Sequence, residues 1–371
     1  MSCEQPKPIT QHTADNSVRN LTANWRVTRS DVILITGANG FIGVHVLQVL
    51  LDKGFSQVRC LVRSSRNVCE LESVAARYNA KVEILRGNLL SQEDCTKACD
   101  GVTLIYHLAV GAAGKSFPGA VMNVVVPTRN LLVAAARQKT LRRFVNVSSF
   151  AVYSNRNKRT RTVLDERCPL DERPQDRGDA YAYAKLKQDQ LVTEYGKRYD
   201  IEHVTVRPGT VYGPGKSGIP GRVGINTFGF FMHLGGSNRI PFTYVSNCAE
   251  AIVLAGLVNG VAGEVFNVVD DDLPTSREFL RQYKRNVEPF PSVYVPHVMS
   301  YAFCWMWEAY SRRSQGQLPP VFSRGEWHAY WKKTLYSNQK LKRSLGWAMR
   351  VPTAEGLRRY FEFCKQSGTH A

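Results

Sequence analysis

A tyrosine and a lysine four residues apart give this chain its clearest chemical signal. Tyr181 and Lys185 lie in the segment Asp179-Ala-Tyr-Ala-Tyr-Ala-Lys185, and at this spacing two side chains share one face of a helix. The ammonium group is expected to lower the pKa of the phenol, so that the tyrosine exchanges a proton near neutral pH. Such a pair suits the oxidation of alcohols and the reduction of carbonyl groups.

A second pair, Tyr183 and Lys187, has the same spacing. The two pairs are offset by two residues, roughly 200° around a helix, so only one of them faces a given site. Pairs of this kind also occur on solvated helix surfaces. The elements around the pairs must therefore decide whether either pair is chemical.

A glycine-rich turn, Thr36-Gly-Ala-Asn-Gly-Phe-Ile-Gly43, joins an apolar run at 32–35 to an amphipathic stretch at 41–51. This pattern predicts a buried strand that turns directly into a helix. The three glycines allow a tight turn and the close approach of a pyrophosphate, and the helix N-terminus supplies amide donors. The turn predicts a dinucleotide site, with purely structural glycines as the alternative.

Further strands are expected at 57–62, 81–85, 102–108 and 143–149, each separated by a helix or crossover. This alternation predicts an α/β fold with a doubly wound parallel sheet, the Rossmann arrangement, and a ligand at the carboxyl ends of its strands. Ser149 ends the last of these strands, where its hydroxyl is expected to bind the substrate oxygen.

The length of the chain suits one large α/β domain and a smaller C-terminal substrate-binding lobe. The polar N-terminal segment has no signal-peptide pattern and is expected to be a loosely ordered extension. The predicted division is 1–30 for this extension, 31–207 with 242–269 for the NAD(P)-binding domain, and 208–241 with 270–371 for the lobe.

The end of the second predicted strand reads Leu61-Val-Arg-Ser-Ser-Arg66 and contains no acid. An acid at this point accepts hydrogen bonds from a ribose 2′-hydroxyl, whereas arginine accommodates a 2′-phosphate. Arg63 and Arg66 therefore favour NADP(H) over NAD(H), unless both side chains simply face solvent.

Taken in order, the motifs resemble those of the extended short-chain dehydrogenases/reductases of the NAD(P)-dependent epimerase/dehydratase type, over about residues 31 to 270. The segments that carry the resemblance are Thr36-Gly37-x-x-Gly40-x-x-Gly43, Gly87-Asn-Leu-Leu90, His107-Leu-Ala109, Val147-Ser-Ser149 with Val152-Tyr153, Tyr181-x-x-x-Lys185, Arg207-Pro-Gly-Thr-Val-Tyr-Gly-Pro-Gly215 and Tyr244-Val-Ser-Asn-Cys-Ala-Glu-Ala251.

The resemblance implies that Ser149, Tyr181 and Lys185 are catalytic. The cofactor site expected from these motifs and the two arginines comprises Thr36, Gly37, Asn39, Gly40, Phe41, Ile42, Gly43, Arg63, Arg66, Asn88, Leu89, Leu108, Ala109, Tyr181, Lys185, Pro208 and Val211. At two positions the chain departs from the family pattern. Asn88 replaces the usual acid, and Phe150 follows Ser149 where the family's dehydratases have an acid, which disfavours the elimination of water.

The substrate is the least defined part of the prediction. The segment 301–310 is apolar and aromatic, and the segment 207–215 resembles hydroxysteroid dehydrogenases and dihydroflavonol reductases more than sugar enzymes. An oxidoreductase for an apolar or multi-ring keto or hydroxy substrate is therefore favoured. The alternatives are a nucleotide-sugar epimerase or reductase, with Asn238 and Arg239 as diphosphate contacts, and a noncatalytic NADP(H) sensor.

The glycine-rich loop at 213–224 is expected to cover the pocket and to decide specificity. The segment 301–310 is too short to cross a bilayer. It is expected to form a helix packed on the lobe, and weak contact of 301–313 with a membrane surface is the alternative.

The composition excludes several classes of protein. The net charge is +18, but no nucleic-acid-binding motif accompanies it, so a solvated basic face beside a phosphorylated cofactor is expected. Nine scattered cysteines without metal-site spacing predict reduced thiols in the cytoplasm and no metal.

The resemblance also implies a homodimer through the helix that carries Tyr181.

Overall fold

The computed structural model describes residues 25–64, 67–78, 80–111, 116–156, 163–227, 229–313 and 323–368. Arg66 and residues 1–24 of the predicted extension lie outside this part of the chain. The described end of that extension is attached to the large domain. Trp25 stacks on Phe55 with ring centroids 5.4 Å apart, and Val27 is buried.

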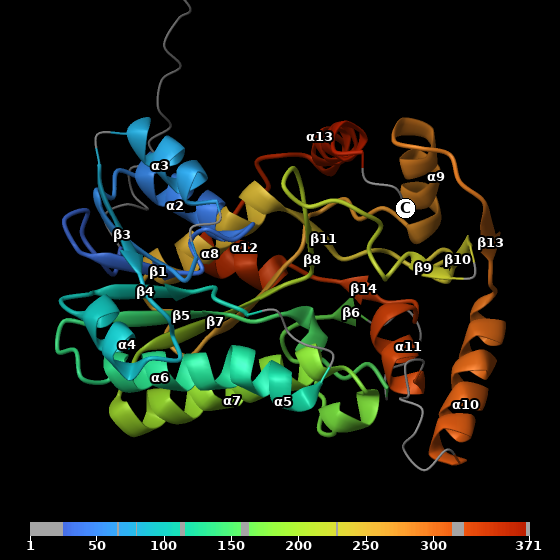
Figure 1. Cartoon of the computed structure of the whole chain (residues 1–371), viewed down its shortest axis with the longest axis horizontal. Coiled ribbons are helices and arrows are strands. Elements are labelled where there is room, and N and C mark those ends of the chain that lie inside the picture. Colours follow the sequence, from blue (N-terminus) through green and yellow to red (C-terminus); the bar gives the residue numbers. More distant parts are fainter. Residues whose placement is uncertain are drawn as a thin grey trace, which may run out of the picture.

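In the described chain, seven parallel strands form one central sheet in the order β12-β7-β5-β4-β1-β2-β3 (Figure 1). Their bounds are β1 Ile33–Thr36, β2 Gln57–Val62, β3 Lys81–Arg86, β4 Leu104–His107, β5 Arg143–Val147, β7 His203–Pro208 and β12 Val265–Val268. This is the doubly wound α/β fold that the sequence predicts, and the predicted strands are present with ends shifted by one or two residues.

Helices cover both faces of this sheet (Figure 1). The helices on one face are α2 Gly43–Asp52, α3 Val68–Ala76, α8 Val245–Leu257 and α12 Gln339–Leu345, and those on the other are α4 Gln92–Cys99, α6 Val126–Ala135 and α7 Ala180–Tyr199. Because both faces are covered, the strands read as apolar runs, and all of Ile33 to Thr36 is buried.

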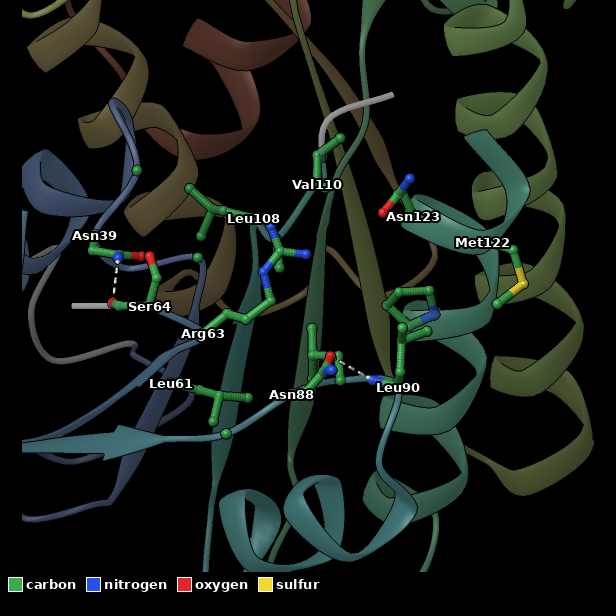
Figure 2. Close-up of a pocket in the computed structure, with 17 residues that line it drawn as sticks. Asn39, Leu61, Arg63, Ser64, Asn88, Leu90, Leu108, Val110, Met122 and Asn123 are labelled. Carbon is green, nitrogen blue, oxygen red and sulfur yellow. Dashed lines mark hydrogen bonds between the residues drawn. The ribbon is translucent and has the colours of Figure 1, made fainter. Parts of the chain in front are cut away.

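The order of the strands reverses between β1 and β4, since β2 and β3 continue on one side and β5, β7 and β12 on the other. In an open parallel sheet this switch point leaves a crevice at the carboxyl ends of the strands. Figure 2 shows the cavity that lies there, with Leu108 after β4 and Arg63 after β2.

The described chain also has seven short strands outside the central sheet and, after β12, four helices besides α12. The strands are β6 Val163–Leu164, β8 Thr210–Tyr212, β9 Gly224–Thr227, β10 Phe230–His233, β11 Phe242–Tyr244, β13 Ser292–Tyr294 and β14 Leu335–Tyr336. The helices are α9 Ser276–Asn286, α10 His297–Arg313, α11 Arg324–Tyr330 and α13 Thr353–Gln366. A short helix, α5 Phe117–Ala120, lies beside α7 in the large domain.

One segment assigned from the sequence to the lobe packs in the core of the sheet. Leu341, Leu345 and Trp347 are buried in the same apolar cluster as β1 and α8. The indole Nε1 of Trp347 donates to the carbonyl oxygen of Asn247 at 3.0 Å. Residues near the end of the chain therefore complete the core of the large domain.

The predicted helix around residues 301–310 is α10, and it packs against α11 as expected, but with few of its apolar side chains buried. Its buried residues are Ser300, Cys304 and Ser311, while Trp305 and Met306 are each 54% exposed. The apolar side chains of this helix thus lie largely on its solvent side.

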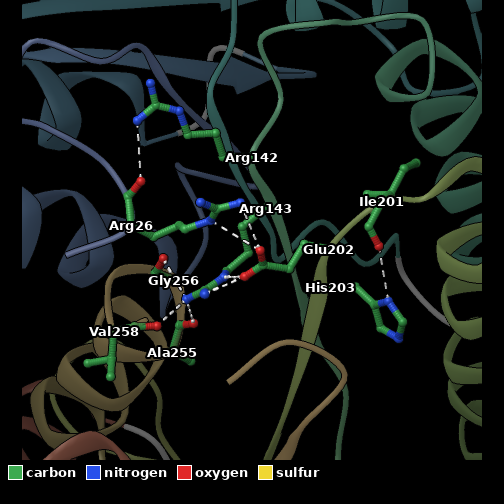
Figure 3. Close-up of polar contacts among 9 residues, drawn as sticks. All are labelled: Arg26, Arg142, Arg143, Ile201, Glu202, His203, Ala255, Gly256 and Val258. Carbon is green, nitrogen blue, oxygen red and sulfur yellow. Dashed lines mark hydrogen bonds and ion pairs between the residues drawn. The ribbon is translucent and has the colours of Figure 1, made fainter. Parts of the chain in front are cut away.

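A buried arginine at the edge of β5 ties the sheet to the end of α8 (Figure 3). The Arg143 side chain is fully buried, and its Nε donates to Glu202 Oε1 at 2.7 Å. Its Nη1 donates to the carbonyl oxygens of Ala255, Gly256 and Val258. Because the last carbonyl groups of a helix have no partner within the helix, this guanidinium satisfies three acceptors that would otherwise be buried without donors.

We expect Arg143→Leu to lower the free energy of unfolding by about 3 kcal/mol, because it leaves these acceptors without donors and leaves Glu202 with Arg26 as its remaining arginine partner. Arg142→Leu is the matched control, since its side chain is 45% exposed and its ion pair with Asp31 spans 3.5 Å. This control is expected to cost about 0.5 kcal/mol or less. Urea unfolding of both variants measures the difference, and equal losses would contradict this role.

Candidate active site

Two adjoining cavities lie where β1, β4, β5 and β7 end. They share the lining residues Gly37, Gly40, Leu108 and Val110. Because the carboxyl ends of these parallel strands meet at one edge of the sheet, residues far apart in the sequence come together there.

The glycine turn forms the wall between the cavities. Gly37 has a φ of +69°, in the region that favours glycine. A Cβ atom at Gly43 would lie 2.2 Å from the carbonyl oxygen of Gly37. Only glycine therefore lets α2 approach the turn this closely, which places the first amides of the helix beside both cavities.

The first cavity extends from the turn over the ends of β2 and β3 to α6 (Figure 2). Its lining residues are Gly37, Asn39, Gly40, Leu61, Arg63, Ser64, Gly87, Asn88, Leu89, Leu90, Leu108, Ala109, Val110, Gly111, Met122, Asn123 and Pro127. Of these lining residues, Val110, Gly111, Met122, Asn123 and Pro127 lie outside every segment that the sequence singled out. Met122 and Asn123 lie just before α6, where no motif marked them.

Arg63 reaches over this cavity from the end of β2 (Figure 2). Among the described residues, none of those lining the cavity is acidic. Asn88 occupies the position where the family usually has an acid, and its Oδ1 accepts a hydrogen bond from the Leu90 amide at 3.1 Å. The charge of the described walls is therefore positive.

The second cavity contains all three predicted catalytic residues. Its lining residues are Gly37, Gly40, Phe41, Ile42, Gly43, Leu108, Val110, Val147, Ser148, Ser149, Phe150, Ala151, Tyr181, Lys185, Pro208, Gly209, Thr210, Val211, Lys216, Arg222 and Tyr330. The described cofactor residues named from the sequence line one cavity or the other, except Thr36. Thr36 is buried beneath the turn, where its hydroxyl accepts a hydrogen bond from the Ala109 amide at 3.3 Å.

Helix α7 presents Tyr181 and Lys185 to this cavity because of where it begins. Asp179 caps the helix, its Oδ1 accepting a hydrogen bond from the Ala182 amide at 3.0 Å. Tyr181 and Lys185 then follow on one face. The competing pair faces elsewhere: Tyr183 packs edge-on against Phe117 and lines a different pocket together with Lys187.

The protonation of Tyr181 corrects one expectation. Burial raises the pKa of its phenol, and a hydrogen bond with Ser149 opposes this only in part. Lys185 does not reverse this shift in the pKa, and its Nζ donates to the carbonyl oxygen of Val147 at 2.7 Å and to Gln188 Oε1 at 2.8 Å. The phenol therefore keeps its proton near neutral pH.

The ammonium of Lys185 is almost fully buried, with 1% of the residue exposed. Burial lowers its pKa to about 8, and the negative charge of Asp189 works in the opposite direction. Asp189 is itself held by a buried ion pair with Arg207, at 3.0 Å between Oδ2 and Nη2. Lys185 is thus fixed in place while it keeps a pKa close to the physiological range.

A chain of buried hydrogen bonds connects this lysine to the glycine turn. Gln188 Nε2 donates to Thr128 Oγ1 at 3.2 Å, and Thr128 Oγ1 lies 2.9 Å from His107 Nε2. His107 Nδ1 lies 2.8 Å from Thr36 Oγ1. Burial lowers the pKa of His107 to about 3, with Lys185 as a further cause, so the imidazole is neutral and bridges two hydroxyls.

Two further cations and a tyrosine line the second cavity without having been named from the sequence. Lys216 and Arg222 come from the predicted glycine-rich loop, and Tyr330 comes from α11. The Arg222 guanidinium lies 5.0 Å from the centre of the Tyr330 ring. No described acid lines this cavity. Lys216 and Arg222 lie within the loop that was predicted to decide specificity, whereas no local signal pointed to Tyr330.

Asn238 and Arg239, the predicted diphosphate contacts, line neither cavity. Asn238 is 3% exposed and accepts a hydrogen bond from the Thr334 amide at 3.1 Å. Arg239 Nη1 donates to the carbonyl oxygen of Leu273 at 2.6 Å. Both side chains therefore make contacts within the lobe.

The described residues contain no cluster of three or more His, Cys, Asp or Glu side chains suited to a metal ion.

A sequence model of the NAD dependent epimerase/dehydratase family matches residues 33–268. The chain therefore belongs to this family of NAD-dependent enzymes, and the resemblance inferred from its motifs is confirmed. The match begins at β1 and ends with β12, so it covers the whole central sheet.

Individual relatives include reductases and epimerases. The chain is 30% identical to cinnamoyl-CoA reductase 1 of Petunia hybrida over 196 residues, which are 51% of this chain and 57% of that protein. It is 26% identical to the 4-hydroxy-2-methyl-3-oxo-4-farnesyl-3,4-dihydroquinoline-1-oxide ketoreductase of Stigmatella aurantiaca over 326 residues, 87% of this chain and 93% of that protein. The chain thus spans little more than half of the first relative and nearly all of the second.

Among solved structures, the fold is similar to the UDP-glucuronic acid 4-epimerase of Bacillus cereus, crystallised with UDP-glucuronic acid and NAD. The TM-score is 0.66 at 21% identity, covering 90% of this chain and 99% of that protein. This likeness confirms the Rossmann arrangement of the sheet.

Proposed function

We propose that this protein transfers a hydride between a nicotinamide cofactor and a keto or hydroxy group of a small molecule, with Tyr181 exchanging the proton. The observation that carries the proposal is the meeting of Ser149, Tyr181 and Lys185 in one cavity, with the glycine turn in its wall. The names of two relatives, a reductase and a ketoreductase, support it.

The two cavities fit the two halves of the cofactor. The amides at the start of α2 suit a pyrophosphate, because the positive end of a helix favours an anion. Asn39, Arg63 and Leu89 would hold the adenosine half, while Val211 and Lys185 would hold the nicotinamide half. When bound, the nicotinamide supplies or accepts the hydride.

Tyr181 and Ser149 would act on the substrate oxygen. A phenol whose pKa is raised by burial keeps its proton near neutral pH, and this protonation state supports donation to a carbonyl oxygen. The Ser149 hydroxyl orients the same oxygen. Lys185 places a positive charge beneath the site, which stabilises the phenolate formed when the proton leaves.

Arg63 supports a preference for NADP(H). Its side chain is exposed at the first cavity, where no described acid is present to accept hydrogen bonds from a ribose 2′-hydroxyl. A guanidinium in this position matches the geometry of a 2′-phosphate.

The substrate proposed first is an apolar or multi-ring ketone. Ile42, Phe150, Val211 and Tyr330 supply apolar or aromatic surface to the second cavity. Pockets of this kind suit apolar ligands, and a few polar groups in the pocket fix the orientation of the ligand. The ketoreductase relative, whose name contains a farnesyl quinoline, agrees with this choice.

We expect Tyr181→Phe to lower turnover by at least about 100-fold, because it removes the proton donor, while NADPH binding stays unchanged. Tyr183→Phe serves as the matched control on the same helix and is expected to keep full turnover. Lys185→Met is expected to weaken both turnover and cofactor binding. Reduction of a panel of apolar ketones, followed through NADPH absorbance, gives the rates. Wild-type turnover in Tyr181→Phe would refute the assignment.

We expect Arg63→Ala to weaken NADPH binding by about 10-fold or more and NADH binding by less than about threefold, since only NADPH carries the 2′-phosphate. Arg86→Ala is the control, because Arg86 ends the neighbouring strand β3 and is exposed without lining the cavity. Fluorescence titration with both cofactors measures the four affinities. An equal effect on NADPH and NADH would remove the proposed preference.

A nucleotide-sugar epimerase or reductase is the second candidate, and one observation favours it. Lys216 and Arg222 line the second cavity, and no described acid is among the residues that line it. Such a pair suits a diphosphate or another anionic group of the substrate. The anionic groups would then be recognised by the loop and α11, and not by Asn238 or Arg239.

If this second candidate is correct, UDP or GDP should raise the melting temperature of the cofactor-bound protein. Lys216→Ala combined with Arg222→Gln should abolish the shift, whereas Arg239→Gln should retain it. Thermal-shift measurements with NADPH present decide the point. Stabilisation by apolar ketones without any shift from UDP or GDP would exclude the nucleotide-sugar reading.

A further inference from the structure

The large apolar side chains of helix α10 face solvent, whereas those of a helix packed on a protein core face that core. Val298 is 82% exposed, Met299 62%, Trp305 54%, Met306 54% and Tyr310 60%. Together with two exposed alanines, these residues repeat at spacings of three and four and cover about half of the helix surface. A surface helix of a globular protein normally shows the opposite pattern.

The inward face of the same helix is largely polar and well partnered. Ser300 is buried, and its Oγ accepts a hydrogen bond from Trp327 Nε1 of α11 at 2.9 Å. Glu308 accepts hydrogen bonds from Arg312 and Arg324, at 2.7 Å each. The orientation of α10 is therefore fixed by specific contacts, so that the apolar face is held outward.

The exposed apolar strip continues into the preceding strand. In β13, Val293 is 54% exposed and Tyr294 is 44% exposed. Figure 1 shows β13 and α10 following one another along one edge of the molecule. More than half of the exposed large apolar side chains in the described chain lie between residues 293 and 310. We call this surface, made of Val293, Tyr294 and the outward face of α10, the apolar edge.

The charges around the apolar edge are mostly positive. Arg312 and Arg313 are exposed at the end of α10. The segment 292–313 contains a single acid, Glu308, and it is held inward by its arginine partners. The chain as a whole carries a net charge of +18. A surface with these properties attracts anions.

We propose that the apolar edge lies in the surface of a bilayer that contains anionic lipids. Large apolar residues with Trp and Tyr among them, flanked by arginines, are the composition of helices that insert their apolar face at the boundary between headgroups and acyl chains. Among the described residues, no helix is long and apolar enough to cross a membrane. The contact is therefore peripheral, and it does not depend on the proposed reaction.

A second copy of the chain fits this surface less well. A helix of 17 residues is about 25 Å long and about 10 Å wide, so one face covers roughly 250 Å². A stable protein interface buries about 800 Å² on each partner. The high net positive charge also makes two copies repel each other. An anionic lipid surface satisfies both the apolar area and the charge.

This contact adjoins the second cavity. The apolar inner residues of α10 pack with Trp327 and Trp331, and α11 supplies Tyr330 to the cavity wall. Tyr330 also donates a hydrogen bond to Asp179 at the start of α7, at 3.2 Å. A single short helix therefore separates the lipid-facing surface from the catalytic cavity.

The test is sedimentation of the full-length protein with vesicles. We expect it to sediment with vesicles that contain phosphatidylglycerol, at least about tenfold more strongly than with pure phosphatidylcholine, and more weakly at high salt. Trp305→Glu with Met306→Glu should reduce binding at least about tenfold. Arg312→Gln with Arg313→Gln should reduce it about fivefold per arginine on anionic vesicles only.

Tyr199→Glu is the matched control for Tyr310→Glu, because both tyrosines are exposed near the end of a helix and only Tyr310 belongs to the apolar edge. Circular dichroism and NADPH binding show whether each variant is folded. Loss of vesicle binding in folded Tyr310→Glu but not in Tyr199→Glu would support the proposal. Absence of wild-type binding, equal binding by all variants, or a lipid-free dimer that Tyr310→Glu dissociates would overturn it.

Discussion

The buried ammonium of Lys185 is the constraint that organises the centre of this molecule. A charge with only 1% of its residue exposed is tolerated when hydrogen-bond acceptors replace water. The carbonyl oxygen of Val147 and the amide oxygen of Gln188 do so, and neither carries a charge. The compensating negative charge belongs to Asp189, which Arg207 holds in a buried ion pair. Strand β5, helix α7 and strand β7 must therefore keep their relative positions for the lysine to remain charged.

The same requirement extends to the cofactor side of the site. Gln188 contacts Lys185 through its oxygen and Thr128 through its nitrogen, so its amide group has only one useful orientation. Thr128 and Thr36 then hold the neutral ring of His107 between them. A displacement of the glycine turn would be transmitted to Lys185 through four side chains, those of Thr36, His107, Thr128 and Gln188. The floor of both cavities thus behaves as one rigid polar layer beneath the residues that are proposed to contact ligands.

The sequence predicted those parts of the site that depend on local backbone geometry. The glycine turn was recognisable because a close approach such as that of Gly43 to Gly37 permits no side chain, and the pair Tyr181 and Lys185 because helical spacing is regular. Tyr330 was not predictable, since its position depends on how α11 packs in the lobe. The direction in which the Tyr181 pKa shifts could not be predicted either, because it depends on burial and on the acceptors to which Lys185 donates. The sequence left open whether α10 packs on the lobe or contacts a membrane surface, because composition identifies an apolar segment but not the side on which it packs.

The packing of α12 into the core of the central sheet has a consequence for how the chain folds during synthesis. The last strand of the sheet, β12, ends at Val268, but Leu341 and Leu345 fill the core beside it only about seventy residues later in the chain. Until the ribosome has released that segment, the completed sheet exposes an apolar hollow next to α8. The nascent protein therefore passes through a stage in which its strands are paired and its core is open.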